Sequence, residues 1–115
     1  MNRFVILEHT TSAGVHWDIM LEAETALTTF SIEPQVLPPE PFQVPFEELP
    51  PHRKFYLGYE GEVSGNRGTV RRIDAGTYQE LEPAVFRING RVMSGILAVD
   101  GKTAICFSFL PIALR

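Results

Sequence analysis

The stretch "VHWDIMLE", residues 15–22, has the pattern of a half-buried β-strand, because every second residue is apolar. Side chains two apart on a strand share a face, so His16 and Asp18 are expected to point the same way. The same two-residue period recurs in nearly every periodic segment of the chain, and no segment sustains a helical stripe over three turns. The sequence therefore predicts an all-β fold.

Seven short segments have this strand pattern, and turn signals such as "TTSAG", "SGNRG", "DAG", "ING" and "VDG" separate them. The predicted strands are residues 4–8, 15–22, 25–32, 69–74, 84–88, 92–99 and 103–109. Short strands joined by Gly-containing turns favour a mainly antiparallel sandwich or small β-barrel over a parallel-sheet fold.

A proline-rich segment interrupts this pattern. Seven of the nine prolines lie between Pro34 and Pro51, where they deny the backbone both helix and ladder hydrogen bonds. The segment is therefore predicted to be a long, stiff loop. Fewer than 35 residues precede it, too few for an independent core. We expect the loop to wrap one barrel, so that residues 1–115 form a single domain.

The charge of the chain is unevenly distributed. A net charge of −4 argues against a protein that coats nucleic acid through bulk electrostatics. Residues 1–51 contain one basic and eight acidic residues, whereas residues 52–115 contain nine basic and six acidic residues. This asymmetry is compatible with a local anion site in the second half, although arginines scattered on solvated strand faces are commoner.

Cysteine usage and hydropathy bear on the compartment. Cys106 is the single cysteine, so no internal disulfide can form, and its apolar surroundings predict a buried, inert thiol. The apolar run before Glu8 and His9 is too short for a signal-peptide core, and no stretch approaches membrane-spanning length. We expect a cytoplasmic protein with no membrane partner.

Two of the three histidines are predicted to meet at one end of a hairpin. His9 follows the first predicted strand, His16 opens the second, and the "TTSAG" turn joins the two strands. With Asp18 they make two imidazoles and one carboxylate, a ligand set for Mn²⁺, Fe²⁺ or Zn²⁺ that leaves coordination positions free. The alternative is a polar strand face on which these side chains only hydrogen-bond one another.

Other residues allow both a functional and a structural interpretation. His52 is a candidate fourth ligand or general acid–base, or simply an exposed residue after two prolines. In "SGNRGT", Arg67 and the backbone N–H groups suit a phosphate, but the segment also suits a hairpin turn. Trp17, Tyr59 and Tyr78 are able to stack on bases, although strand aromatics more often belong to the core.

Several segments also match, in order, the pattern of a known family. "FVILEH" and "HWDIMLE" resemble its Phe-Val-x-Gln-x-His strand and its second histidine followed by Tyr-Asp-Phe-Arg-Leu-Glu; "LTTFSIEP" resembles Leu-x-x-Trp-x-x-Pro. "HRKFYLGYEG", residues 52–61, matches His-Pro-Leu-x-Tyr-x-x-Phe-Glu-Gly in spacing, and "GNRGTV", "DAGTY" and "FRINGRVMSG" resemble three later segments. Over most of its length the chain resembles the 3′-phosphoesterase domain of bacterial DNA ligase D, which also occurs as stand-alone proteins.

The resemblance implies a small β-barrel that binds Mn²⁺, or Zn²⁺ or Co²⁺, through His9, His16 and Asp18. It implies that His52 and Tyr56 are catalytic residues that face the scissile phosphate. The implied activity is trimming of DNA 3′ ends in repair by non-homologous end joining. It comprises removal of a terminal ribonucleoside by phosphodiester cleavage and of a 3′-phosphate by monoester hydrolysis. The implied partners are DNA 3′ ends, together with a DNA ligase and a polymerase supplied in trans as separate proteins. We expect the protein to be a monomer.

The chain departs from the family pattern at three places. Six residues separate His9 from His16, where the family commonly has five. Met20 replaces the family arginine after Asp-Phe, and Val44 lies near the place of another arginine upstream of the third histidine. A charge-assisted contact is worth about 1.5 to 3 kcal/mol, so other cations must substitute if phosphate is bound. The candidate phosphate-binding residues are Arg53, Arg67 and Arg71, with Arg3 as a further possibility.

Two other functions fit parts of the pattern. A non-catalytic β-barrel of the same fold would bind nucleic acid or a protein partner, and the missing arginine favours it. A metalloprotein like the non-haem iron oxygenases would use His16, Asp18 and His52 as a facial triad. The chain is short for that barrel and shows no obvious co-substrate pocket.

Overall fold

Ten antiparallel β-strands and one short 3₁₀-helix form the part of the chain described by the computed structural model, residues 2–101 and 103–109. In chain order the elements are β1 (Arg3–Thr11), β2 (Gly14–Glu22), β3 (Leu27–Ile32), β4 (Phe42–Val44), β5 (Glu47–His52), η1 (Lys54–Leu57), β6 (Gly61–Glu62), β7 (Thr69–Glu82), β8 (Val85–Gly90), β9 (Ser94–Val99) and β10 (Ile105–Phe109). The predicted all-β class is confirmed.

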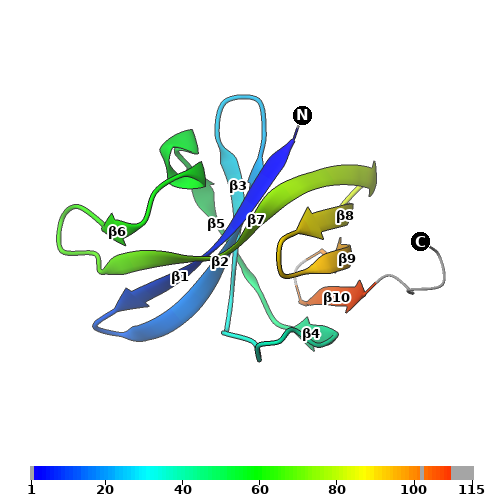
Figure 1. Ribbon diagram of the computed structural model, residues 1–115, viewed down its shortest axis with the longest axis horizontal. Helices are drawn as coiled ribbons and strands as arrows, with labels where there is room; N and C mark the ends of the chain where they lie inside the picture. The colour runs from blue at the N-terminus through cyan, green and yellow to red at the C-terminus, as the bar shows by residue number, and fades with distance from the viewer. Residues whose placement is uncertain (1, 102, 110–115) are drawn as a thin grey trace.

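The strands form one sheet in the order β4-β10-β9-β8-β7-β1-β2-β3-β5, and β6 pairs with β7 beside this path. The long strands β1, β2 and β7 cross the centre of the molecule, with β8, β9 and β10 gathered at one side (Figure 1). Within the described residues, β4 and β5 end the path without pairing with each other. The sheet is therefore not closed, and the predicted barrel describes it only loosely.

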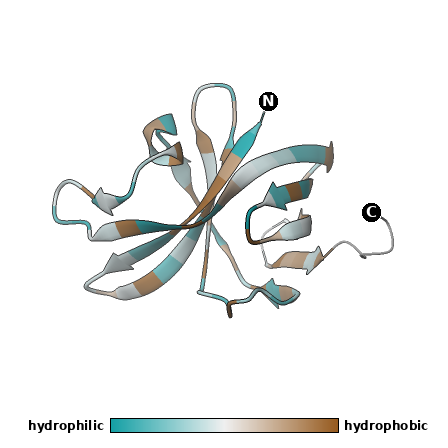
Figure 2. Ribbon diagram, in the orientation of Figure 1, coloured by the Kyte–Doolittle hydropathy of each residue, from teal (hydrophilic) through white to brown (hydrophobic). Residues whose placement is uncertain are grey.

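The central hairpin is buried on both faces. Along β1, Phe4 and Ile6 face a larger core, whereas Val5 and Leu7 face a smaller one. This explains why β1 contains four consecutive apolar residues and not an alternation of apolar and polar ones. Figure 2 shows them as a brown run following the N-terminus. The larger core draws side chains from both halves of the sheet: Phe4, Ile6, Trp17, Ile19, Leu21, Phe30, Ile32, Val44, Phe86, Ile88, Met93, Leu97, Ile105 and Phe107.

All seven predicted strands have counterparts, but the turn predicted at "DAG" is wrong. β7 runs without interruption to Glu82. The Asp74 carboxylate accepts hydrogen bonds from the backbone N–H groups of Arg91, Val92 and Met93 in the β8–β9 turn. It therefore stabilises that turn and does not mark a turn at its own position. A Cβ at Gly76 would lie 2.0 Å from the Asn89 carbonyl oxygen. The glycine therefore permits close strand packing and does not mark a turn.

The proline-rich segment is not the continuous loop that we predicted, because it contains β4 and β5. Pro50 and Pro51 lie inside β5, whose described partner is β3 alone. The register between the two strands shifts between Leu27 and Thr29, opposite these prolines. An edge strand tolerates residues that lack an N–H group, since that side has no ladder to complete. The two-residue strand β6 was also missed.

Two smaller sequence-based expectations concern β10 and the membrane. Cys106 lies in β10 and is half-buried, not buried as predicted. Among residues 2–101 and 103–109, no helix has the length and apolar character needed to cross a membrane.

Candidate metal centre

The turn end of the β1–β2 hairpin brings His9, His16 and Asp18 together. His9 and His16 are directly opposite across the hairpin, and Thr11 pairs with Gly14 around a two-residue turn. Positions placed symmetrically about a two-residue turn are cross-strand pairs, and His9 and His16 are such positions, so the six-residue spacing requires no bulge. The two rings lie with centroids 4.8 Å apart at 63°. Asp18 follows two residues along β2, on the same face.

The three side chains offer ligand atoms that all lie within 4.8 Å of one another. His9 Nδ1 is 3.6 Å from Asp18 Oδ2, and His16 Nε2 is 3.2 Å from Asp18 Oδ1. Asp18 is 1% exposed, and its Oδ1 accepts no hydrogen bond from the described residues, because the nearby His16 Nε2 is within ion-pair distance but not at a hydrogen-bonding angle. A buried carboxylate oxygen without a donor is costly. A divalent cation would satisfy it, and two imidazoles with one carboxylate suit Mn²⁺ or Zn²⁺.

The electrostatics of Asp18 support the same interpretation. Burial raises the pKa of Asp18, while the nearby imidazoles of His16, His9 and His52 oppose that rise. Burial prevails because water cannot solvate the carboxylate. A bound cation would reverse this balance by supplying positive charge where the protein supplies imidazoles.

The orientation of His9 is set by a backbone group that the sequence did not reveal. His9 Nε2 lies 2.7 Å from the Arg67 carbonyl oxygen, which can only accept, so Nε2 carries the proton. In the neutral ring the Nδ1 lone pair then faces Asp18, as a metal ligand requires. Gly68 makes this contact possible: its φ is +89°, and a Cβ there would lie 1.9 Å from the Thr10 carbonyl oxygen. The glycines of "SGNRG" were the available signal, but we interpreted them as a turn or phosphate loop.

A cleft of about 450 Å³ opens beside this group. His9 and Asp18 lie on one side, and His52, Arg53 and Tyr56 from the end of β5 and from η1 line it as well. The His52 and Tyr56 rings meet edge to face with centroids 5.9 Å apart. His52 Nδ1 donates to the Pro50 carbonyl oxygen at 2.9 Å, which leaves Nε2 free for chemistry. The structure thus brings all the predicted metal-binding and catalytic residues to one neighbourhood.

The predicted phosphate-binding arginines do not share one location. Arg53 and Arg67 line the cleft, although the Arg67 guanidinium also donates to the Ser64 carbonyl and hydroxyl oxygens. Arg71 lies on the other face of the sheet, where its Nη2 pairs with Glu8 Oε1 at 2.9 Å. Glu8 neighbours His9 in β1 and therefore points away from it.

The positions without the family arginines are apolar and filled. Met20 is 1% exposed, packs in the smaller core and also lines the cleft. Val44 belongs to the larger core and does not line the cleft. Of the aromatics considered for base stacking, Trp17 is buried in the larger core, Tyr78 packs against it, and Tyr59 packs against the smaller core.

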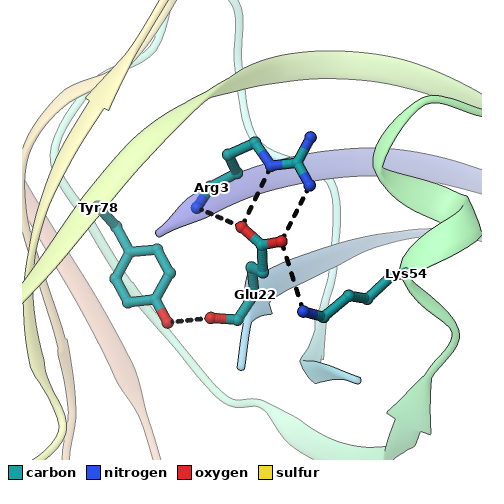
Figure 3. Close-up of polar contacts among 4 residues, drawn as sticks. All are labelled: Arg3, Glu22, Lys54 and Tyr78. Carbon is teal, nitrogen blue, oxygen red and sulfur yellow. Dashed lines mark hydrogen bonds and ion pairs between the residues drawn. The ribbon is translucent and has the colours of Figure 1, made fainter. Parts of the chain in front are cut away.

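The other end of the hairpin carries a closed polar cluster (Figure 3). Glu22 accepts hydrogen bonds from the Arg3 backbone N–H and guanidinium, and Lys54 Nζ lies 3.6 Å from Glu22 Oε2. The Arg3 hydrogen bonds lower the pKa of Glu22 to about 2. Tyr78 donates to the Glu22 carbonyl oxygen at 2.6 Å. Arg3 is therefore engaged by Glu22, and the contact between Lys54 and Glu22 links η1 to the hairpin.

Comparisons with known proteins assign no family. The chain matches no protein-family model, and no curated protein is significantly similar to it. The function proposed below rests on the residue pattern and on the geometry of the cleft.

Proposed function

We propose that this protein is a divalent-metal-dependent phosphoesterase that processes DNA 3′ ends. The observation that carries the proposal is the buried Asp18 carboxylate beside His9 and His16, whose Oδ1 accepts no hydrogen bond from the described residues, next to a cleft that His52 and Tyr56 also line. A buried anion with two neighbouring imidazoles fits a cation site, and the additional acid–base and donor groups fit an ester substrate.

His9, His16 and Asp18 would hold the cation, with Mn²⁺ as our first choice and Zn²⁺ or Co²⁺ as alternatives. When bound, such an ion neutralises phosphate charge and lowers the pKa of the water bound to it towards about 7. The Arg67 carbonyl keeps His9 in the tautomer that presents Nδ1.

The other residues of the cleft supply the remaining interactions. His52 Nδ1 donates to Pro50, so Nε2 faces the substrate, and with the ring protonated Nε2–H would protonate the leaving oxygen or stabilise charge in the transition state. The Tyr56 hydroxyl would donate to a non-bridging oxygen. Arg53 would add a charge-assisted contact that partly replaces the arginine lost at Met20.

The choice of DNA 3′ ends as substrate comes from the resemblance to the 3′-phosphoesterase domain. It predicts two reactions at one site: diester cleavage that releases a terminal ribonucleoside, and hydrolysis of a 3′-phosphate monoester. Both place a phosphate with at least one negative charge beside the same cation, so one cleft would serve both.

The test uses metal-stripped protein with a primer-template that carries either a 3′-terminal ribonucleotide or a 3′-phosphate. We expect trimming with Mn²⁺ and none without metal. His16→Ala should abolish it, and Arg71→Ala is the matched control because it lies on the opposite face. Tight metal binding without trimming under any metal would contradict the enzymatic function, and failure to bind metal would contradict the site itself.

One observation favours a second candidate, a non-catalytic binding module with the same metal group. Met20 places an apolar side chain, buried in the smaller core, where the family has an arginine. A module of this kind would bind metal and DNA without cleaving the DNA, and the same incubation followed by a DNA-binding measurement distinguishes it.

A further inference from the structure

Phe55 presents an aromatic ring to solvent next to the cleft. It lies in η1 beside Tyr56 and is 54% exposed. Its neighbours Tyr56, Leu57 and Tyr59 pack against the smaller core, whereas Phe55 is not among the described residues that do so. The exposed ring is therefore held in place by partly buried neighbours without itself contributing to a core.

The ring belongs to a continuous aromatic group that starts inside the cleft. Phe55 lies with its centroid 4.6 Å from that of Tyr59 at an interplanar angle of 33°, and 5.4 Å from that of Tyr56. Tyr56 in turn meets His52 at 5.9 Å. A molecule bound beside the metal group that extended past His52 and Tyr56 would therefore meet Phe55 and Tyr59 next.

Positive charge accompanies this aromatic surface. The Arg53 guanidinium carbon is 5.5 Å from the Phe55 ring centroid and 6.0 Å from that of Tyr56, and Arg53 also lines the cleft. Cations beside exposed aromatic rings are the combination with which proteins bind single-stranded nucleic acid: the cation meets the phosphodiester backbone and the rings meet the bases.

We propose that Phe55, together with the Arg53 guanidinium that lies over its ring and the adjacent Tyr59, stacks on the nucleobase nearest the 3′ end of a single DNA strand. This inference rests on the proposed function, because that function places the terminal phosphate in the cleft. Every base has a face that can stack, so the platform would bind ends of any sequence. It would prefer single-stranded or frayed ends, whose terminal base is free of its partner.

The experiment uses a single-stranded oligonucleotide whose 3′-terminal base is 2-aminopurine, a base whose fluorescence falls when it stacks. Its 3′-phosphate is replaced by a 3′-methylenephosphonate, which keeps the terminal negative charge but is not removed by hydrolysis. The full chain is titrated in the presence of Zn²⁺, which is not paramagnetic. We expect the wild-type protein to quench the fluorescence. Phe55→Leu, which keeps apolar bulk but has no ring, should abolish quenching and weaken binding about tenfold. Phe55→Trp should retain both.

Leu81→Ala is the matched control, because Leu81 is 44% exposed on β7 and its loss removes a surface apolar group elsewhere. Thermal melting of each variant checks that it is folded. Hydrolysis of bis(4-nitrophenyl) phosphate by the wild-type protein with Mn²⁺ tests the phosphoesterase proposal separately. If that ester is hydrolysed but 2-aminopurine is not quenched, or if Phe55→Leu quenches as well as wild type, the stacking platform is overturned and the phosphoesterase proposal remains.

Discussion

The two ends of the β1–β2 hairpin each hold a carboxylate on the same face of β2, but only one of the two has donors for both of its oxygens among the described residues. Glu22, at the open end, has donors from Arg3 and a cation in Lys54 (Figure 3). Asp18, at the turn end, is more deeply buried, faces two imidazoles, and keeps Oδ1 without a partner among the described residues. The described residues therefore satisfy the Glu22 carboxylate, whereas they leave one oxygen of Asp18 without a hydrogen bond.

The difference separates a carboxylate that is paired within the fold from one that fits the proposed cation site. Arg3 lowers the pKa of Glu22 to about 2, so the charge of Glu22 stabilises the fold. Burial raises the pKa of Asp18, so its charge is disfavoured in the protein alone. A cation bound beside Asp18 would favour its charged form.

The largest expected effect comes from Asp18→Asn, which keeps the shape of the side chain and removes its charge. Metal-dependent trimming should fall about 1,000-fold, because the cation supplies several kcal/mol of transition-state stabilisation. Isothermal titration calorimetry should show loss of metal binding. Metal-free Asp18→Asn should melt no lower than metal-free wild type, since no buried charge remains. A clear loss of stability in the metal-free state would make Asp18 a structural residue like Glu22.

Asp74→Ala tests a third carboxylate, one that the protein satisfies completely. Asp74 accepts N–H groups from Ala75, Arg91, Val92 and Met93. Removal of the acceptor leaves buried donors unpaired in the β8–β9 turn, so we expect a loss of about 3 kcal/mol in the free energy of unfolding. Urea denaturation measures it. Metal affinity should stay within twofold of wild type, and a proportionate loss of metal affinity would show that the two regions are coupled.

Arg53→Ala and Arg71→Ala form a matched pair of exposed arginines on opposite faces of the sheet. Arg53 lines the cleft, whereas Arg71 pairs with Glu8. Loss of a charge-assisted contact to phosphate should raise KM for a 3′-phosphate oligonucleotide about tenfold in Arg53→Ala. Arg71→Ala should change KM by less than about twofold in the same steady-state assay. Equal effects of the two substitutions would place the substrate somewhere other than the cleft.

Glu22→Gln should have the smallest effect, about 1 kcal/mol at pH 7, because Arg3 is 59% exposed and solvent screens the pair. The pKa of Glu22 is lowered in the folded protein, so its contribution is complete above about pH 4.5 and disappears as the pH falls to about 2. The difference in urea midpoint between wild type and variant should therefore shrink over that interval. A difference that stays constant down to pH 2 would exclude the ion pair as its source.

The strands with a clear local hydrophobic pattern could be predicted from the sequence. Hydrophobic patterning between turn signals identified the seven strands that build most of the sheet, and the turn between His9 and His16 was enough to bring both imidazoles to one place. The strands that escaped detection are short or contain prolines, because an edge strand such as β5 needs few backbone donors and shows little alternation. Nothing in its own sequence marks it as part of a sheet.

Features that depend on pairing between distant strands could not be predicted. Arg71 was a reasonable phosphate contact until its pairing with Glu8 put it on the far face, and that register includes a shift between Ile6 and Leu7. The carbonyl oxygen of Arg67 is a backbone atom that every residue type has, so the sequence does not indicate that it orients His9. Long-range register and backbone acceptors leave no local trace in sequence.

The position of β5 at the end of the sheet also gives the two sides of the cleft different local stabilities. His9 and Asp18 lie on β1 and β2, each flanked by two strands, whereas His52 ends a strand whose single described neighbour is β3. Segments with fewer ladder hydrogen bonds open at a lower free energy than the centre of a sheet. Amide hydrogens of β5 should therefore exchange sooner than those of β1 and β2, so we expect the His52 side of the cleft to open more readily than the side that carries the proposed metal ligands.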